Sequence, residues 1–146
     1  MHKPGDASKL RVGVVASRFN EDITDSMLDG ALDVLREWRV SQKNTFVTRA
    51  YGSFEIPFAA ARLIKKHKLD AVIALGCIIK GETRHDEYLA HAAAQGLMRV
   101  MLDFCVPVGF GIITTNTLAQ AHARSRGKAN HGAKAAVAAL EAALLS

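Results

Sequence analysis

AVIALGCIIKGETRHDEYL, residues 71–89, is the stretch of sequence that decides the fold. Its first five residues form a continuous apolar run entered from the sequence KLD, which is typical of a parallel strand buried on both faces. After Gly76 the chain stays near-extended through residues 77–79 and then reaches KGET at residues 80–83. Apolar residues recur at helical spacing beyond that point, so the stretch predicts a buried strand, a turn and a helix.

The turn between this strand and this helix is a candidate anion site with a histidine beside it. Unpaired backbone N–H groups and the positive end of a helix dipole gather at a helix N-terminus and favour an anion. Thr83 is the predicted cap, and Asp86 could complete a variant of the capping box. His85 falls in the first helical turn, where it could transfer a proton, and we predict it as the catalytic residue. Taken alone, the same pattern also fits a plain turn followed by a solvent-exposed histidine.

Length and composition indicate one globular domain. The chain has 146 residues, of which 49% are hydrophobic and 23% are charged, enough to bury a core without help. We predict that residues 1–9 form a flexible N-terminal arm and that residues 10–146 form a single domain. The N-terminal sequence MHKPGDASKL lacks the apolar core of a signal peptide, and no apolar run approaches a membrane span, so we expect a cytoplasmic protein.

Charge and cysteine content say little about the partner but favour no cysteine metal site. The net charge of +5 is spread along the chain with few interleaved aromatic residues, and small anionic substrates account for it as well as nucleic acid does. Cys77 and Cys105 both lie in apolar sequence and match no metal-ligand spacing. We therefore predict that both are reduced and structural.

Four strand-and-helix units follow one another along the chain. The predicted strands are residues 10–16, 44–50, 71–75 and 107–113, and the second of them is expected near a sheet edge because it alternates. Helices are expected after each strand, with Asn20 as the candidate N-cap of the first and Pro57 opening the second. This order predicts an α/β fold with a four-stranded parallel sheet flanked by helices on both faces. Function is then expected at the carboxyl ends of the strands.

Several side chains near the predicted strand ends have two possible roles. Phe19 could contact a ligand or close the end of the core, and Phe110 is predicted to be core unless its ring faces the sheet's carboxyl edge. Glu55 could be a surface carboxylate or a hydrogen-bond acceptor for ligand hydroxyls. Arg124 and Lys128 would share a helix face suited to a phosphate, although Gly127 interrupts that helix. The last helix is apolar almost all round, which predicts burial on two sides and hence a partner subunit.

Five motifs taken together resemble the lumazine synthase family: RFN at 18–20, GSFEIP at 52–57, ALGCIIKGETRHDEY at 74–88, PVGFGIITT at 107–115, and the Arg124/Lys128 pair. The resemblance spans residues 10–145. It implies a flavodoxin-like three-layer sandwich. It also implies condensation of 5-amino-6-(D-ribitylamino)uracil with 3,4-dihydroxy-2-butanone 4-phosphate to 6,7-dimethyl-8-ribityllumazine, in riboflavin biosynthesis, with no metal and no organic cofactor. Members form pentamers with each active site between two neighbours, so the resemblance implies a homo-oligomer.

The resemblance also assigns roles to residues. Those expected against the pyrimidine are Phe19, Cys77, Ile78 and Ile79, joined by Phe110 of the adjacent subunit. Those expected around the ribityl chain are Ser53, Phe54 and Glu55. Those expected at the phosphate are Glu82 and Thr83 through backbone N–H groups, with Arg124 and Lys128 as cations. His85 would transfer protons.

The chain departs from the family pattern at three places. Asp86 stands where members usually have an aromatic residue, Tyr51 replaces a proline, and residues 126–132 are one residue shorter with His131 in place of a lysine. Asp86 keeps open an alternative in which the pocket binds a flavin or the protein forms a shell with weak or no catalysis. A phosphoryl-accepting receiver domain and a flavodoxin are excluded, because their acidic pair and their phosphate loop are missing after the first strand.

Overall fold

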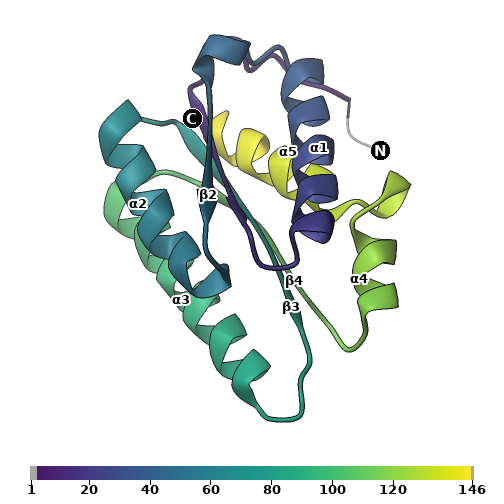
Figure 1. The fold of residues 1–146 in the computed structure, drawn as a ribbon. Helices are drawn as coiled ribbons and strands as arrows, with labels where there is room; N and C mark the ends of the chain where they lie inside the picture. Colours follow the sequence, from purple (N-terminus) through teal and green to yellow (C-terminus); the bar gives the residue numbers. More distant parts are fainter. Residues whose placement is uncertain (1–2, 146) are drawn as a thin grey trace.

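The sheet has four parallel strands in the order β2-β1-β3-β4 (Figure 1). The structure is a computed structural model and describes residues 3–145. The strands are β1 (Val12–Ser17), β2 (Thr45–Ala50), β3 (Ala71–Ile79) and β4 (Val108–Thr115). Both the parallel four-stranded sheet and the edge position of β2 are confirmed.

Helices cover both faces of the sheet, which confirms the three layers. The helices are α1 (Glu21–Glu37), α2 (Ile56–His67), α3 (His85–Phe104), α4 (Leu118–Arg124) and α5 (His131–Ala143), with short 3₁₀ turns η1 (Gln42–Asn44), η2 (Ser53–Glu55) and η3 (Gly127–Ala129). Helices α2 and α3 pack on one face, while α1 and α5 pack on the other (Figure 1). None of the helices among the described residues is long and apolar enough to cross a membrane.

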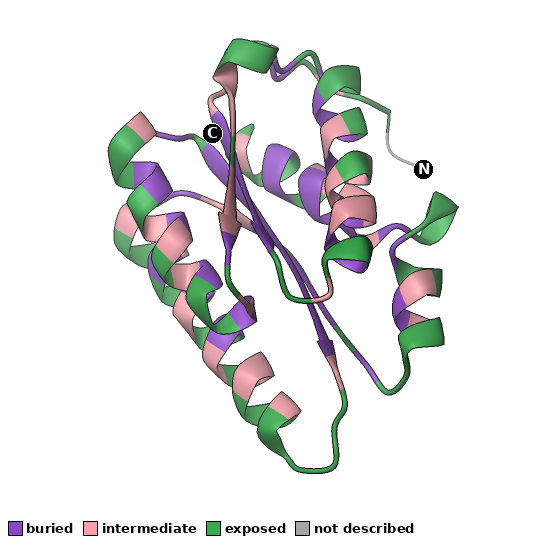
Figure 2. Ribbon diagram, viewed as in Figure 1, coloured by how far each residue is buried: buried purple, intermediate pink, exposed green. Residues whose placement is uncertain are grey.

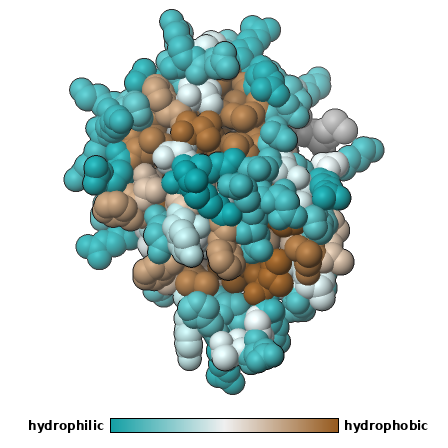
Figure 3. Space-filling view, in the orientation of Figure 1, coloured by the Kyte–Doolittle hydropathy of each residue, from teal (hydrophilic) through white to brown (hydrophobic). Residues whose placement is uncertain are grey.

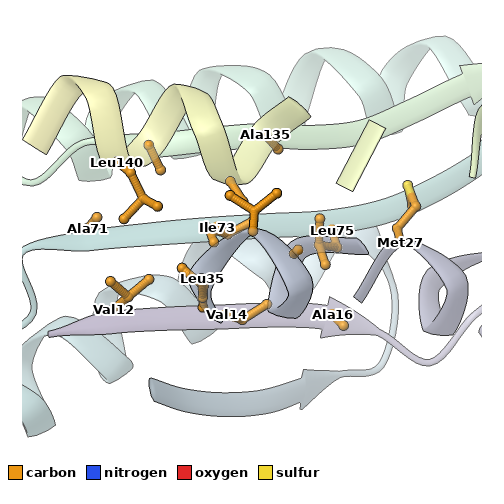
Figure 4. Packing of buried hydrophobic residues seen from close by; sticks show 14 of the residues in the cluster. Val12, Val14, Ala16, Met27, Leu35, Ala71, Ile73, Leu75, Ala135 and Leu140 are labelled. Carbon is orange, nitrogen blue, oxygen red and sulfur yellow. The ribbon is translucent and has the colours of Figure 1, made fainter. Parts of the chain in front are cut away.

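The two central strands are buried on both faces (Figure 2). Successive side chains of a strand point to opposite faces, so alternate residues of β3 enter different cores. Ile73 and Leu75 pack with residues of β1, α1 and α5, as Figure 4 shows, whereas Val72 and Ala74 pack against α2 and α3. This two-sided burial explains why β3 reads as an unbroken apolar run.

Strand β3 extends beyond its neighbour β1. The last paired residues of these two strands are Ala16 and Leu75, while β3 continues beside β4 as far as the Ile79–Thr115 pair. Residues 76–79 therefore have no partner in β1. Because β1 and β3 lie side by side while the chain leaves them in opposite directions, this gap is the topological switch point where open α/β sheets bind ligands.

Two predicted helix caps differ in the structure. Asn20 precedes α1 but makes no side-chain cap; its backbone is left-handed, with φ of 59°, and its amide Nδ2 donates to the Cys77 carbonyl oxygen at 3.1 Å. Helix α3 begins at His85, with Arg84 in the cap position in place of Thr83. Thr83 still supports this helix start, because its hydroxyl accepts from the His85 N–H at 3.2 Å.

The chain after β4 corrects two further expectations. Gly127, with φ of +57°, separates α4 from the 3₁₀ turn that contains Lys128, so Arg124 and Lys128 do not share one continuous helix. Helix α5 is buried on two sides within its own chain. Gly132 packs on the backbone of α1 at Met27, while the other side packs on β3 and β4. The apolar pattern of α5 therefore does not by itself require a partner subunit.

The segment before β1 is attached to the core at Ala7. This residue is 1% exposed, and its N–H donates to the Trp38 carbonyl oxygen at 2.8 Å. Cys105, predicted in an apolar setting, is exposed at the C-terminus of α3, whereas Cys77 is buried as expected. Both cysteines are free.

We predict that Gly109→Ala lowers the free energy of unfolding by about 1–3 kcal/mol, the usual cost of overpacking. A Cβ at Gly109 in β4 would overlap the Ala135 carbonyl oxygen of α5, which is backbone and cannot move aside. Gly81→Ala is the matched control, because nothing lies within 4 Å of its added Cβ. Urea unfolding followed by circular dichroism measures both variants. Equal midpoints would contradict the close approach of α5 to β4.

Candidate active site

A pocket of about 540 Å³ opens at the carboxyl edge of the sheet, beside the unpaired end of β3. This volume is within the range of small-molecule sites. Its lining comes from three places: the loop after β1, the loop after β2, and the end of β3 with the start of α3. The lining residues are Phe19, Asn20, Tyr51, Gly52, Ser53, Phe54, Glu55, Cys77, Ile78, Ile79, Gly81, Thr83, His85, Asp86 and Leu89. Three motifs that are far apart in sequence thus meet at one site.

Hydrogen bonds fix the loop after β1 on both sides. The N–H of Phe19 donates to the Tyr51 carbonyl oxygen at 3.1 Å, and the Asn20 amide donates to Cys77 in β3. The second bond supplies a donor to a carbonyl that β1 leaves unpaired. The Phe19 residue is 62% exposed, so its ring does not close the core and is available to a ligand.

The loop after β2 brings polar groups close to β3. Ser53 is buried against Gly76, where an added Cβ would lie 2.6 Å from the Ser53 hydroxyl, so only glycine allows this approach. Glu55 is exposed and accepts the Gly52 N–H on Oε1 at 3.0 Å. This bond orients the carboxylate, which lines the pocket, and leaves its second oxygen without that partner. Phe54, 60% exposed, adds an aromatic surface to the same wall.

The end of β3 and the start of α3 form the remaining wall. Residues 80–85 are exposed, and the Lys80 N–H donates to the Thr115 carbonyl oxygen at 2.8 Å, which ties the turn to β4. His85 stands in the first turn of α3 within the pocket lining, and Asp86 beside it is half-buried. The positive end of the α3 dipole lies at this turn and favours an anion, although the His85 N–H already donates to the Thr83 hydroxyl and the Glu87 N–H to the Arg84 carbonyl oxygen.

Four of the residues singled out from the sequence lie outside the pocket lining: Glu82, Phe110, Arg124 and Lys128. Glu82 lies in the same turn, between two lining residues. Phe110 is 50% exposed on the edge strand β4, so it is not core. Arg124 is exposed on α4, where its Nη1 donates to the Thr114 carbonyl oxygen at 3.3 Å.

Six lining residues are not among the predicted site residues: Asn20, Tyr51, Gly52, Gly81, Asp86 and Leu89. Asn20 was read as a helix cap, although its place directly after Phe19 puts it at the same strand end. Leu89 was read only as part of the buried stripe of α3. Its spacing of four residues from His85 places both on one helix face, and this signal could have identified it.

The pocket lining contains two carboxylates, those of Glu55 and Asp86, and no lysine or arginine. Its other titratable side chains are those of Tyr51, Cys77 and His85. Burial raises the pKa of the Cys77 thiol to about 11, and the Asp22 carboxylate acts in the same direction. The thiol is therefore protonated at neutral pH and is not a nucleophile. No three His, Cys, Asp or Glu side chains within residues 3–145 gather in a way that could hold a metal ion.

Comparisons with known proteins agree in pointing to one family. A family model described as 6,7-dimethyl-8-ribityllumazine synthase matches residues 9–146. The chain is similar to the 6,7-dimethyl-8-ribityllumazine synthase of Porphyromonas gingivalis, with 42% identity over 92% of this chain and 84% of that protein. It is also similar to the proteins of the same name from Parabacteroides distasonis and Phocaeicola vulgatus. Each is 39% identical over 93% of this chain, covering 86% and 82% of those proteins.

We predict that iodoacetamide at pH 8 modifies Cys105 and leaves Cys77 unmodified in the folded protein. At this pH a thiol with a pKa near 11 is ionised in roughly one molecule in a thousand, and Cys77 is also buried. Peptide mass spectrometry before and after denaturation in urea distinguishes the two sites. Rapid native labelling of Cys77 would show that the pocket does not enclose its thiol as described.

Proposed function

The chain belongs to the 6,7-dimethyl-8-ribityllumazine synthase family, and we propose that the pocket beside β3 is where it carries out this family's reaction. The enzyme is a transferase of riboflavin biosynthesis. It condenses 5-amino-6-(D-ribitylamino)uracil with 3,4-dihydroxy-2-butanone 4-phosphate and releases phosphate and water. The observation that carries the proposal is the meeting of three separate sequence motifs in one pocket at the switch point of the sheet. We propose a cytoplasmic location, as the sequence predicted.

The reaction consists of proton transfers around carbon–nitrogen bond formation. The free amine of one substrate adds to the ketone of the other, and loss of water gives an imine. Elimination of phosphate follows and leaves a new carbonyl, to which the ribityl-bearing nitrogen adds; loss of a second water closes the ring. His85 is the proton-transferring side chain in this proposal, because it lines the pocket in the first turn of α3 and an imidazole exchanges protons near neutral pH. Holding two substrates together contributes a further roughly 7–11 kcal/mol to lowering the barrier.

The two ends of the pyrimidine substrate have different requirements. Its planar ring suits the exposed ring of Phe19, and its amide-like edge suits the backbone of residues 77–79, which has no partner in β1. The ribityl chain carries hydroxyl groups that suit Ser53 and the oriented carboxylate of Glu55. Phe54 closes the same side with an apolar surface.

The phosphate of the second substrate requires a cation that the pocket lacks. Backbone N–H groups around Glu82 and Thr83 suit the phosphate, but no lysine or arginine lines the pocket. Arg124 is exposed outside the pocket of its own chain, and so is Phe110. We therefore propose that a neighbouring copy supplies Arg124 and Phe110, with Lys128 near the phosphate, which makes the enzyme a homo-oligomer built on pentamers with active sites between subunits.

Exposed apolar side chains support an oligomer. Tyr51 is 74% exposed and lines the pocket. Phe58 on α2 and Tyr88 on α3 are 67% and 68% exposed. Figure 3 shows hydrophobic areas among polar ones on the face where β2 lies in front. Large exposed apolar surfaces of this kind mark interaction sites.

We predict that His85→Ala slows lumazine formation by about 10²-fold to 10⁴-fold, the share of general acid–base catalysis, without abolishing it. Purified protein is mixed with both substrates, and the fluorescent lumazine is followed over time. His91→Ala is the matched control, because His91 is an exposed histidine of α3 outside the pocket lining. A wild-type rate in His85→Ala would refute its role. Absent turnover in the wild-type protein, with retained flavin binding, would favour the non-catalytic alternative.

We also predict that Arg124→Ala raises the KM for the butanone phosphate, and that mixed oligomers restore activity. When His85→Ala and Arg124→Ala chains are co-expressed, about one site in four combines His85 of one chain with Arg124 of its neighbour, if assembly is random. Activity of the tagged and purified mixture should then exceed that of either variant alone. Absence of any recovery would mean that both residues act from the same chain.

A further inference from the structure

The segment that carries Arg124 is strongly cationic. No acidic residue occurs between Asp103 and Glu141, whereas the basic residues in the middle of this interval are His122, Arg124, Arg126, Lys128, His131 and Lys134. Some of these charges lie close enough to act on one another: burial lowers the pKa of His131, and the charges of Lys134 and Arg124 lower it further. Like charges repel, so the segment needs ties to the rest of the molecule to keep one conformation.

The first tie is His122 on α4, which stands between an acid and a base. Arg126 Nη2 lies 2.9 Å from His122 Nδ1, and Asp22 Oδ2 of α1 lies 3.6 Å from His122 Nε2. A guanidinium only donates hydrogen bonds, so Nδ1 accepts and the proton of the neutral ring is on Nε2, facing the carboxylate. His122 thus connects the first turn of α1 with the residues that follow α4.

The second tie is Asn130, which is 8% exposed. Its Oδ1 accepts the N–H groups of Gly132 and Ala133 at 2.8 and 3.1 Å, and its Nδ2 donates to the Ser26 carbonyl oxygen of α1 at 3.0 Å. Gly30 of α1 leaves room for this side chain. Residues 124–129 are therefore held against α1 at both ends, while Gly127 in the middle has a left-handed backbone.

We propose that His122 is a positioning residue for Arg124, acting through the chain Asp22–His122–Arg126; this inference rests on the proposed role of Arg124 at the phosphate. Helix α4 has only seven residues and one buried side chain, Ala121, so it depends on such ties for its position. Helix α1, which follows the pocket loop of Phe19, thereby also fixes the segment that presents Arg124.

A contact of Asp22 with the His122 imidazole has a specific advantage over a direct ion pair with Arg124. If Asp22 bound Arg124, the carboxylate would compete with a substrate phosphate for the guanidinium. In the structure Asp22 instead contacts His122, and Arg124 donates to the Thr114 carbonyl oxygen. The carboxylate therefore compensates the cationic segment without occupying the side chain that binds the phosphate.

The test uses the intact oligomer and steady-state kinetics with each substrate varied in turn. His122→Leu removes both polar contacts and should raise the KM for the butanone phosphate roughly three- to tenfold, the effect of one orienting hydrogen bond. The KM for the pyrimidine and kcat should stay within about twofold of wild type. His122→Gln, whose amide can both accept from Arg126 and donate to Asp22, should restore the wild-type KM.

Two further variants make the result decisive. Asp22→Asn, at an exposed side chain, should reproduce part of the KM increase even if His122→Leu folds poorly. In an Arg124→Ala background, His122→Leu should cause no additional increase, because a positioning residue acts only through the residue that it positions.

An unchanged KM for the butanone phosphate in both His122→Leu and Asp22→Asn would overturn the inference. An additive effect in the Arg124→Ala background, or an equal rise in the KM for the pyrimidine, would overturn it too. If Arg124→Ala alone leaves the KM for the butanone phosphate unchanged, the proposed role of Arg124 fails first, and this inference with it. The two failures are therefore distinguishable from the single variants.

Discussion

The unequal length of two neighbouring strands determines where this molecule can bind a substrate. Strand β1 leaves the sheet at Ser17, whereas β3 continues to Ile79 beside β4. Backbone groups on one side of residues 76–79 therefore lack a strand partner, and a buried peptide group without a partner is costly. The protein satisfies one of them with the Asn20 amide and leaves the others facing a pocket. The loops after β1 and β2 then only need to supply side chains around an opening that the sheet already provides.

Most of the fold follows from periodicity, because burial on two faces imposes a continuous apolar run on β1 and β3. Features that depended on one distant contact did not follow. Asn20 has the residue type of a cap, but the unpaired carbonyl of Cys77 is 57 residues away in sequence and uses its amide instead. Helix α5 reads as a helix between subunits, yet small residues such as Gly132 let it pack between α1 and the sheet of its own chain. Local sequence cannot distinguish an apolar surface covered by the same chain from one covered by another.

The sequence predicted the residues of the pocket lining better than it predicted the place of Arg124 and Phe110. Residues after β1 and β2, and at the end of β3, could be gathered from the sequence because parallel strands all end at one sheet edge. Arg124 and Phe110 belong to the same list of motifs but lie outside the pocket of their own chain. A motif records that a residue serves a site and carries no information about which copy of the chain provides it. Only the three-dimensional arrangement separates the two groups.

This separation has an electrostatic consequence for assembly. The pocket lining carries the carboxylates of Glu55 and Asp86, whereas the chain from 104 to 140 contains no acid and presents Arg124 and Lys128. Placing them on different surfaces favours contact between the pocket of one copy and the cationic segment of the next. Such a contact is heterologous, and heterologous contacts close into rings when the rotation between copies permits. The charge distribution of a single chain thus fits the ring-forming subunit that we propose.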